Sequence, residues 1–320
     1  MERLDQADKL LKQRKYLEAI ALCEEVHQAY PEEESVLLLL AWAHYDNGSP
    51  AQALKYLEIL FARELSRKIF TGFAFDELVR IYKQEKNFGR LTEICENAVA
   101  VQPEDIGLLT ELGNAYLQAG LSDDACRIYE KLVRLENDNP AFYCRLGEAL
   151  FAAGRLEESK TAFLKAGAID PDQVDYYYYK IADLFARGGH AAEAKNLLAA
   201  CIATNPANPL YHCSQGDLLI ALGQVQEALI AYETAAQCDH SGASAYYNRL
   251  GNTFMKERLF DRAANAFQKA INCEALLPYY KNLAAAYEAM GQTGLAQDAL
   301  KRAGNIETKK STTSQQAVEV

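Results

Sequence analysis

The sequence predicts an all-α solenoid of about nine helix-turn-helix units, each some 34 residues long. A pattern of small and large residues recurs at separations of 33 to 35 residues over most of the chain, and periods of this size are typical of repeat architectures. Within each half of the period, large apolar residues recur at spacings of three, four and seven, which indicates two short amphipathic helices per unit.

Three positions define the repeat. The first holds a small residue, which we expect in the first helix of each unit: Gly113, Gly147, Ala182, Gly216, Gly251 and Ala284. Twelve residues later a second small residue follows, at Ala125, Ser159, Ala194, Ala228, Ala263 and Ala296. Four residues further stands a large apolar residue, at Tyr129, Phe163, Leu198, Tyr232, Phe267 and Leu300. The small pair lets the two helices approach closely, and the large residues fill the space on either side.

Glycine and proline mark the ends of the expected helices. A glycine stands seven residues after the first small residue in five units, at Gly120, Gly154, Gly189, Gly223 and Gly291. Glycine is favoured where a helix stops and the chain turns. Prolines that close several units stand at Pro31, Pro103, Pro171 and Pro206.

This combination resembles the tetratricopeptide repeat family, most closely the bacterial proteins that consist of such repeats alone. The resemblance implies a right-handed superhelix whose first helices line a concave face. On this alignment the nine units run over 1–33, 34–67, 72–105, 106–139, 140–173, 175–208, 209–242, 244–276 and 277–310. We expect four regions along the chain: two N-terminal units (1–67), an irregular third unit (68–105), units four to nine (106–310) and a disordered tail (311–320).

The third unit departs from the pattern, because Val79 and Leu91 replace both small residues and extra sequence precedes it at 67–71. Units of a solenoid contact only their neighbours, so the array should be least regular here. We expect a kink, or a break, at this unit.

Composition argues against several classes of function. The net charge of −11 disfavours binding to nucleic acid, and no apolar stretch is long enough for a signal peptide or for insertion into a membrane. We therefore expect a cytoplasmic protein. Its eight cysteines form no C-x-x-C pair, and neither phosphate-binding glycine motifs nor H-E-x-x-H occur. We expect no metal, no cofactor and no enzymatic activity.

The second unit carries an apolar candidate surface. Residues 36–45 read VLLLLAWAHY, and a helix that is apolar all round must be buried on more than one side. The resemblance places four of its residues on the concave face: Leu38, Leu39, Trp42 and Tyr45. Two interpretations stay open, a partner or dimer interface and a surface covered by the first unit or by the sequence near Phe70, Phe73 and Phe75.

A polar candidate surface follows from the same alignment in units five to nine. Its residues at the usual contact positions are Arg145, Tyr176, Tyr179, Lys180, Asn248, Arg249, Asn252, Lys281 and Asn282. The cations favour an acidic or carboxylate-bearing peptide, although Glu148 and Asp183 stand three residues after Arg145 and Lys180. Asparagine suits an extended backbone, because its amide donates and accepts. The five-residue dicarboxylate clamp of chaperone-binding family members is incomplete here, which disfavours chaperone tails as ligands.

The leading hypothesis is a non-enzymatic scaffold or adaptor that binds a protein or peptide in its concave groove. One alternative is a self-associating assembly factor that forms a homodimer through the second unit. Another is a regulatory subunit of a separately encoded enzyme.

Overall fold

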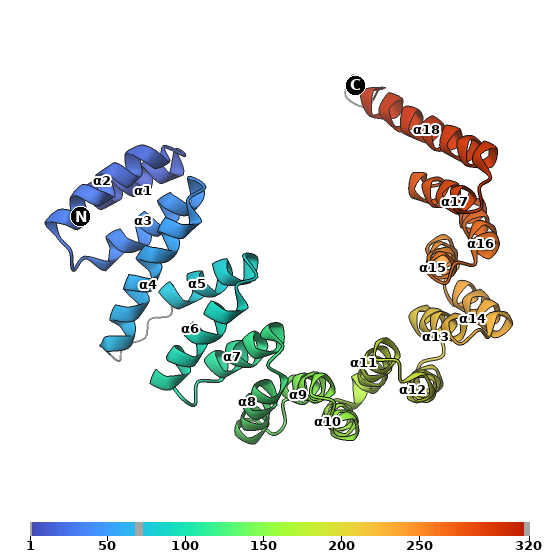
Figure 1. Cartoon of the computed structure of the whole chain (residues 1–320), viewed down its shortest axis with the longest axis horizontal. Coiled ribbons are helices and arrows are strands. Elements are labelled where there is room, and N and C mark those ends of the chain that lie inside the picture. The colour runs from blue at the N-terminus through green and yellow to red at the C-terminus, as the bar shows by residue number, and fades with distance from the viewer. Residues whose placement is uncertain (1, 68–72, 317–320) are drawn as a thin grey trace. The chain divides into compact units, whose positions relative to one another are not determined.

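The computed structural model describes residues 2–67 and 73–316, with side chains up to residue 304. Its α-helices are α1 (Glu2–Lys12), α2 (Tyr16–Ala29), α3 (Glu34–Asp46), α4 (Pro50–Ser66), α5 (Phe73–Gln84), α6 (Phe88–Val101), α7 (Ile106–Ala119), α8 (Ser122–Leu135), α9 (Pro140–Ala152), α10 (Leu156–Ile169), α11 (Val174–Arg187), α12 (Ala191–Thr204), α13 (Pro209–Ala221), α14 (Val225–Cys238), α15 (Ala243–Lys256), α16 (Phe260–Cys273), α17 (Leu277–Ala289) and α18 (Thr293–Gln316) (Figure 1). A short 3-10 turn (Pro171–Gln173) precedes α11.

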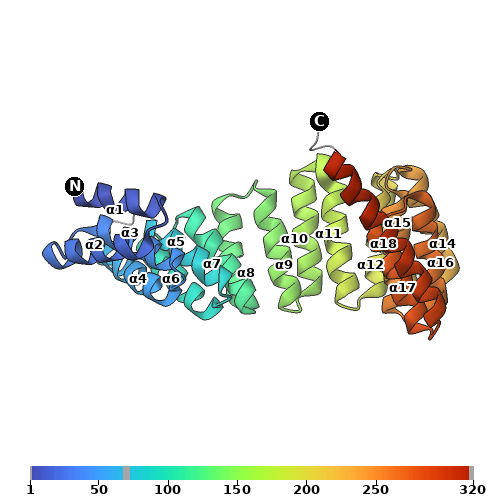
Figure 2. The same cartoon turned by 90° about the horizontal axis from the view of Figure 1, so that it is seen from above.

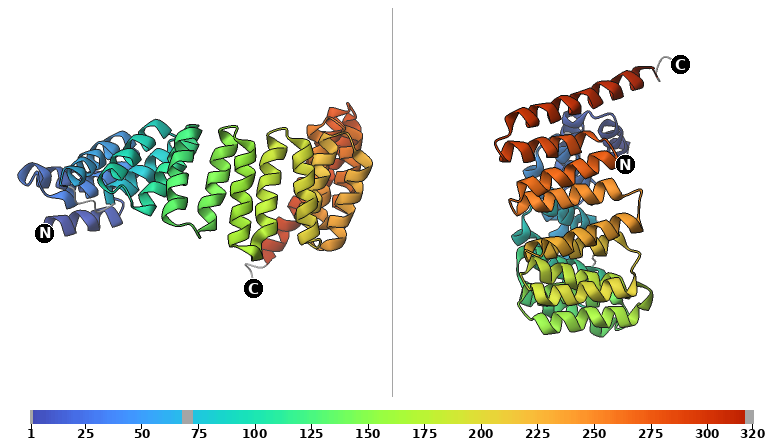
Figure 3. Two further views of the ribbon diagram at one scale, coloured as in Figure 1. Left: turned by 90° about the horizontal axis from the view of Figure 1, so that it is seen from below. Right: turned by 90° about the vertical axis from the view of Figure 1, so that its right-hand side faces the viewer.

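These helices form consecutive pairs that coincide with the nine expected units, which confirms the all-α repeat fold. The chain also divides into two larger compact parts, which we call unit 1 (Met1–Ala162) and unit 2 (Phe163–Val320). Each of these parts contains several of the helix-turn-helix repeats, which keep their names as the first to the ninth unit. In unit 2, α11 and α12 run antiparallel side by side (Figure 2), and the orange and red helices α15 to α18 follow one another in layers (Figure 3). The first helices α11, α13, α15 and α17 also contact one another in series. We call the surface that they form the first-helix face of unit 2.

The turns inside the repeats have the left-handed backbone that the glycines predict. Gly120, Gly154, Gly189, Gly223 and Gly291 have φ between 73° and 82°, where a residue with a Cβ is strained. Arg14, Lys86 and Arg258 occupy the same place in units one, three and eight, with φ of 55° to 61°. These three units therefore keep the turn without its glycine.

Inside each repeat the first small residue lies against the large residue of the second helix. A methyl group at Gly216 would stand 2.6 Å from Cδ2 of Tyr232, and the Tyr232 ring is fully buried. In units four to nine the small residue is glycine where the large residue is aromatic, and it is alanine where the large residue is leucine (Ala182 with Leu198, Ala284 with Leu300). The repeat thus matches the size of the two residues, because an aromatic ring needs the space that a methyl group would fill.

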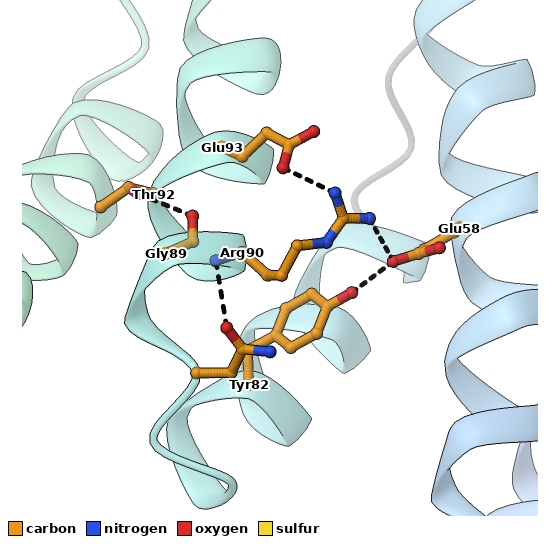
Figure 4. A network of polar contacts seen from close by, with 7 residues as sticks. Glu58, Tyr82, Gly89, Arg90, Thr92 and Glu93 are labelled. Carbon is orange, nitrogen blue, oxygen red and sulfur yellow. Dashed lines mark hydrogen bonds and ion pairs between the residues drawn. The ribbon is translucent and has the colours of Figure 1, made fainter.

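The third unit is joined to the second more closely than the sequence predicted. One buried apolar cluster includes residues of every helix from α3 to α7, with Leu91 fully buried in it. A polar network adds to this contact (Figure 4): Glu58 on α4 accepts hydrogen bonds from the Tyr82 hydroxyl and from Arg90, both at 2.5 Å, and Arg90 also binds Glu93 at 2.6 Å.

A break at this unit is therefore not found in the described residues, while the kink that was the other expectation stays a prediction. Val79 and Leu91, which replace the small pair, are buried in the apolar cluster. The inserted segment itself, 68–72, lies outside the described residues.

The last helix, α18, continues through Gln316 and so includes the first residues of the segment 311–320 for which disorder was expected. Proline is absent from 293–316, so every residue of this span can donate a helical hydrogen bond. Residues 317–320 lie outside the described part of the chain.

Six of the eight cysteines are buried as small apolar residues, while Cys238 and Cys273 are exposed. Burial raises the pKa of the Cys23 thiol to about 11, which lowers its reactivity as a nucleophile. Over residues 2–67 and 73–316, none of the helices combines the length and the apolarity that crossing a bilayer requires.

Candidate partner-binding site

A cavity of about 350 Å³ opens on the first-helix face of unit 2. Three successive first helices, α11, α13 and α15, supply most of its wall, and α12 supplies one residue. The lining residues are Tyr179, Ala182, Asp183, Ala186, Arg187, Leu198, Ser214, Asp217, Leu218, Ala221, Arg249 and Lys256. This volume lies within the range of small ligand sites in proteins, and the wall combines apolar side chains with charges of both signs.

An ion pair between neighbouring repeats organises one side of the cavity. Arg249 on α15 binds Asp217 on α13, with 2.7 Å between Nη2 and the carboxylate, and it also donates to the Ser214 hydroxyl. Asp217 further accepts from the hydroxyls of Thr253, at 2.5 Å, and Tyr232. Burial lowers the pKa of Arg249, but the charge and the hydrogen bond of Asp217, together with the nearby Tyr232 and Cys213, outweigh burial, and the net shift is upward. Arg249 therefore stays charged and fixed in place.

The α11 side of the cavity is aromatic and more exposed. Tyr179 lies against the ring of Tyr211, with 5.3 Å between centroids, and its hydroxyl accepts a hydrogen bond from Ser214 at 3.4 Å. The ammonium group of Lys180 lies 5.8 Å from the ring centroid of Tyr176, within the range of a cation-π contact. Tyr176 itself is 42% exposed, so a flat apolar ring is accessible beside a cation.

The two remaining cations of the lining differ in their partners. Arg187 pairs with Asp183 at 2.5 Å, in a pair whose side chains are 69% and 41% exposed. Lys256, at the end of α15, is exposed and makes no hydrogen bond or ion pair with the part of the chain that the structure describes. The cavity thus holds two internally balanced pairs and one cation that has no counter-charge among the described residues.

The structure brings several of the predicted polar residues together. Tyr179 and Arg249 line the cavity, and Tyr176 and Lys180 stand on the same helix α11. Towards the C-terminus, Asn282 on α17 donates to Asn248 on α15 at 2.9 Å, which links the last two units. The nearby residues Asn252 and Lys281 are exposed.

Arg145 is on α9 of unit 1, where it binds Glu148 at 2.8 Å. The sequence had suggested this neutralising pair. The ammonium group of Lys180 lies near the Tyr176 ring, and Asp183 binds Arg187.

The apolar surface of the second unit is divided between burial and exposure. Leu39 is buried in a cluster with residues of the first unit, and Leu38 packs against the cluster that joins the second and third units. Tyr45 donates to Gln84 at 2.6 Å and lies beneath the Arg80 guanidinium, 4.6 Å from it. Trp42 is the exposed residue of the four, and 40% of it is accessible to solvent.

Covering by neighbours therefore explains part of this surface. The first unit covers Leu39, and the third unit contributes Gln84 and Arg80 around Tyr45. Three phenylalanines were considered as a cover. Phe75 is buried, with 6.1 Å between its ring centroid and that of Phe61. Phe73 is 66% exposed, and Phe70 lies outside the described residues.

Sequence reasoning missed the role of Asp217. The signal was present, because Asp217 and Arg249 are 32 residues apart, close to one repeat length, with opposite charges. It also missed the cavity, whose apolar wall depends on small residues such as Ala186 and Ala221. Among the described residues, no group of three or more His, Cys, Asp and Glu side chains is placed to hold a metal ion.

Residues 10–65 match a family model described as "Tetratricopeptide repeat". Residues 110–174 and 179–246 match a second family model with the same description. Together these segments are more than half of the chain.

Curated relatives match only with part of their own length. The TPR repeat-containing protein MJ1428 of Methanocaldococcus jannaschii is 23% identical over 283 residues, which are 80% of this chain and 47% of that protein. The cytochrome c-type biogenesis protein CycH of Rhizobium meliloti is 36% identical over 100 residues, 30% of this chain and 26% of that protein. The chain thus spans about half of one relative and about a quarter of the other.

Among solved structures, a tetratricopeptide repeat protein from Parabacteroides merdae is similar over 82% of this chain and 98% of that one, with a TM-score of 0.51 and 16% identity. This likeness concerns the fold.

Proposed function

The chain belongs to the tetratricopeptide repeat family, whose repeats mediate protein-protein interactions, and from this premise we propose that it is a non-enzymatic adaptor. It binds an extended segment or a helix of a partner protein on the first-helix face of unit 2. The observation that carries the proposal is the cavity between α11, α13 and α15, with the exposed ring of Tyr176 beside it. In its wall stands Lys256, a cation without a partner in the part of the chain that the structure describes.

Affinity requires contacts with several repeats. Micromolar binding corresponds to about 8 kcal/mol, whereas one exposed ion pair contributes roughly 0.2 to 1 kcal/mol. The candidate residues satisfy this requirement, because Tyr176, Lys256 and Lys281 stand on the first helices of three different repeats. A partner that contacts all three gains apolar, ionic and hydrogen-bonding contacts at once.

An acidic partner fits this face best. The whole chain carries a net charge of −11, yet the cavity wall holds three cations and two carboxylates, and each carboxylate is bound to a cation within it. A local positive excess on an acidic protein favours a complementary carboxylate and disfavours like-charged surfaces.

A non-enzymatic role agrees with how the polar groups of the cavity are engaged. The Ser214 hydroxyl accepts from Arg249 and donates to the hydroxyl of Tyr179, whereas a nucleophile needs an adjacent base. The Asp217 carboxylate is engaged by Arg249, Thr253 and Tyr232. These groups build a binding surface.

Two further arrangements use the same fold. The partner segment can belong to a separately encoded enzyme, which makes the chain its regulatory subunit. The other arrangement is self-association through the second helix-turn-helix repeat (34–67), and the exposure of Trp42 favours it. Neither arrangement requires a change in the cavity between α11, α13 and α15. We place the adaptor in the cytoplasm, as the sequence led us to expect.

The test compares partner capture from the source cell by two variants of the full chain. Tyr176→Ala with Lys256→Glu alters the first-helix face, whereas Ile230→Ala with Lys195→Glu makes the same kind of change on the second helices α14 and α12. Proteins retained by the wild type and by the second variant, and lost with the first, support the proposal. Equal retention by all three chains contradicts it.

A further inference from the structure

The cavity exists because one position of the repeat changes size. In α7, α9, α13 and α15 the residue that corresponds to Ala186 is large: Leu117, Phe151, Ile220 and Met255. In α11 it is alanine, and Ala221 on the next first helix is small as well. Both alanines line the cavity. The hollow is therefore specified by this repeat and is not a general property of the array.

The apolar part of the wall is suited to a side chain and not to water. Ala182, Ala186, Leu198, Leu218 and Ala221 offer no hydrogen-bonding side-chain atoms, and an apolar surface of this kind gains free energy when an apolar group displaces water from it. Ala182, Leu198 and Leu218 are buried in the fold, so the wall is held in place by the core of the repeat.

The polar part of the wall is suited to a negative charge. Arg249 and Arg187 are each bound to a carboxylate of the wall, whereas Lys256 has no partner in the described chain. A ligand carboxylate can bind Lys256 without displacing an internal partner. The apolar wall and this cation lie in one cavity of about 350 Å³.

We propose that this cavity binds a large apolar side chain of the partner segment, with a carboxylate of the same segment bound by Lys256. The inference rests on the proposed function and specifies its ligand: a peptide in which leucine, methionine or a similar residue stands next to glutamate or aspartate. Apolar burial gives the affinity, and the charge selects the neighbouring residue.

The test uses four fluorescein-labelled nine-residue peptides with a Gly-Ser framework. Their two central residues are Leu-Glu, Ser-Glu, Leu-Lys or Ser-Lys, and binding to the full chain is measured by fluorescence anisotropy up to millimolar protein. We expect Leu-Glu to bind at least about tenfold more tightly than Ser-Glu, because one buried side chain has an effect of this size. Leu-Lys should bind more weakly than Leu-Glu.

Variants of the chain assign the effect to the cavity. Ala186→Leu fills it and should remove the preference for Leu over Ser. Ala221→Leu provides a second obstruction at an exposed residue, in case the first variant fails to fold. Ala152→Leu is the matched control, because Ala152 occupies the position of Ala221 in another repeat and is also exposed. Lys256→Ala should remove the preference for Glu over Lys and leave the preference for Leu over Ser.

Three results overturn the inference: no binding of the Leu-Glu peptide at millimolar concentration, equal binding of the Leu-Glu and Ser-Glu peptides, or wild-type preferences in folded Ala186→Leu and Ala221→Leu chains. Partner capture separates this failure from that of the proposed function. If captured partners depend on Tyr176 and Lys256 but not on Ala186, the face is the binding site and the cavity is not its anchor. If they depend on none of the three, the proposed function fails as well.

Discussion

Gly251 on α15 lies directly beneath the ring of Phe267 on α16, so that a methyl group at Gly251 would overlap the ring. Phe267 is fully buried, so a shift of its ring would disturb the side chains packed around it. Gly251→Ala should therefore destabilise unit 2 by about 1–3 kcal/mol, the usual cost of overpacking a core, although alanine is the better helix former by about 1 kcal/mol.

The matched changes are Gly89→Ala and the double variant Gly251→Ala with Phe267→Leu. A methyl group at Gly89 meets nothing within 4 Å, so Gly89→Ala should raise the melting temperature slightly. The double variant recreates the pair Ala182 and Leu198, and its two changes should couple by roughly 0.5 to 3 kcal/mol. Additive effects in a thermal melt followed by circular dichroism would contradict the size-matching interpretation.

Asp217 is the acceptor for three side chains of unit 2, those of Arg249, Thr253 and Tyr232. Asp217→Ala leaves these donors without their acceptor, and a buried donor without a partner costs about 1–3 kcal/mol. We expect a clear fall in melting temperature. Asp183→Ala, which removes the exposed partner of Arg187, should cost less than about 1 kcal/mol. If the two variants melt at the same temperature, Asp217 does not organise the cavity wall.

His44 should make unit 1 sensitive to acid. Its ring stacks on Tyr56, with 5.6 Å between centroids, and its Nε2 is buried without a hydrogen-bond partner in the described chain. Burial lowers the pKa of His44 below its ordinary value of 6.5, against the opposing charge of Glu24. The folded chain therefore binds this proton less readily than the unfolded chain does. The stability contributed by neutral His44 is complete above pH 6.5 and is lost as the pH falls below that value.

The measurement for His44 is the melting temperature of unit 1 between about pH 8 and about pH 5, followed by Trp42 fluorescence. His44→Phe keeps an aromatic ring and removes the titration, so its melting temperature should decline less than that of the wild type over this range. Parallel profiles for the two chains would assign the acid sensitivity to other groups.

Trp42 tests the self-association hypothesis. It is 40% exposed and is the only tryptophan of the chain, and exposed aromatic residues are enriched at the centres of interfaces. If the chain forms a dimer through the second unit, Trp42→Ala should dissociate it in sedimentation velocity experiments, whereas Leu17→Ala, at a 72% exposed leucine on α2, should not. A wild-type chain that stays monomeric at high concentration excludes this dimer.

Much of the candidate site could be placed from the sequence, because the repeat assigns each residue to a helix face. Tyr176, Tyr179 and Arg249 were found in this way, and all three lie in or beside the cavity region of unit 2. The hydrogen-bond and ion-pair partners of the predicted side chains could not be predicted. Whether a charged side chain is free depends on the neighbouring repeat, and the partners of Arg249 and Asn282 are Asp217 and Asn248 of the preceding units.

Contacts between repeats, which the sequence pattern does not show, also matter for the third unit, where a kink or a break was expected. Val79 and Leu91 break the small-residue pattern, and pattern alone indicates a weak point. The packed structure buries both residues and adds the contact of Glu58 with Arg90 and Tyr82. Local irregularity was visible in the sequence, whereas its compensation by neighbouring helices was not.

The sequence by itself determined the helices, their pairing and their turns, because the 34-residue period, the size-matched residues and the turn glycines are local properties of the chain. Only the tertiary structure decided which of the exposed-looking residues remain available. Arg249 is bound by Asp217, and Leu39 is covered by the first unit. Lys256, in the wall of the cavity that Ala186 also lines, has no counter-charge within residues 2–67 and 73–304. The physical reason is that hydrogen bonds, burial and cavities depend on contacts between repeats, and these contacts join residues about one period apart.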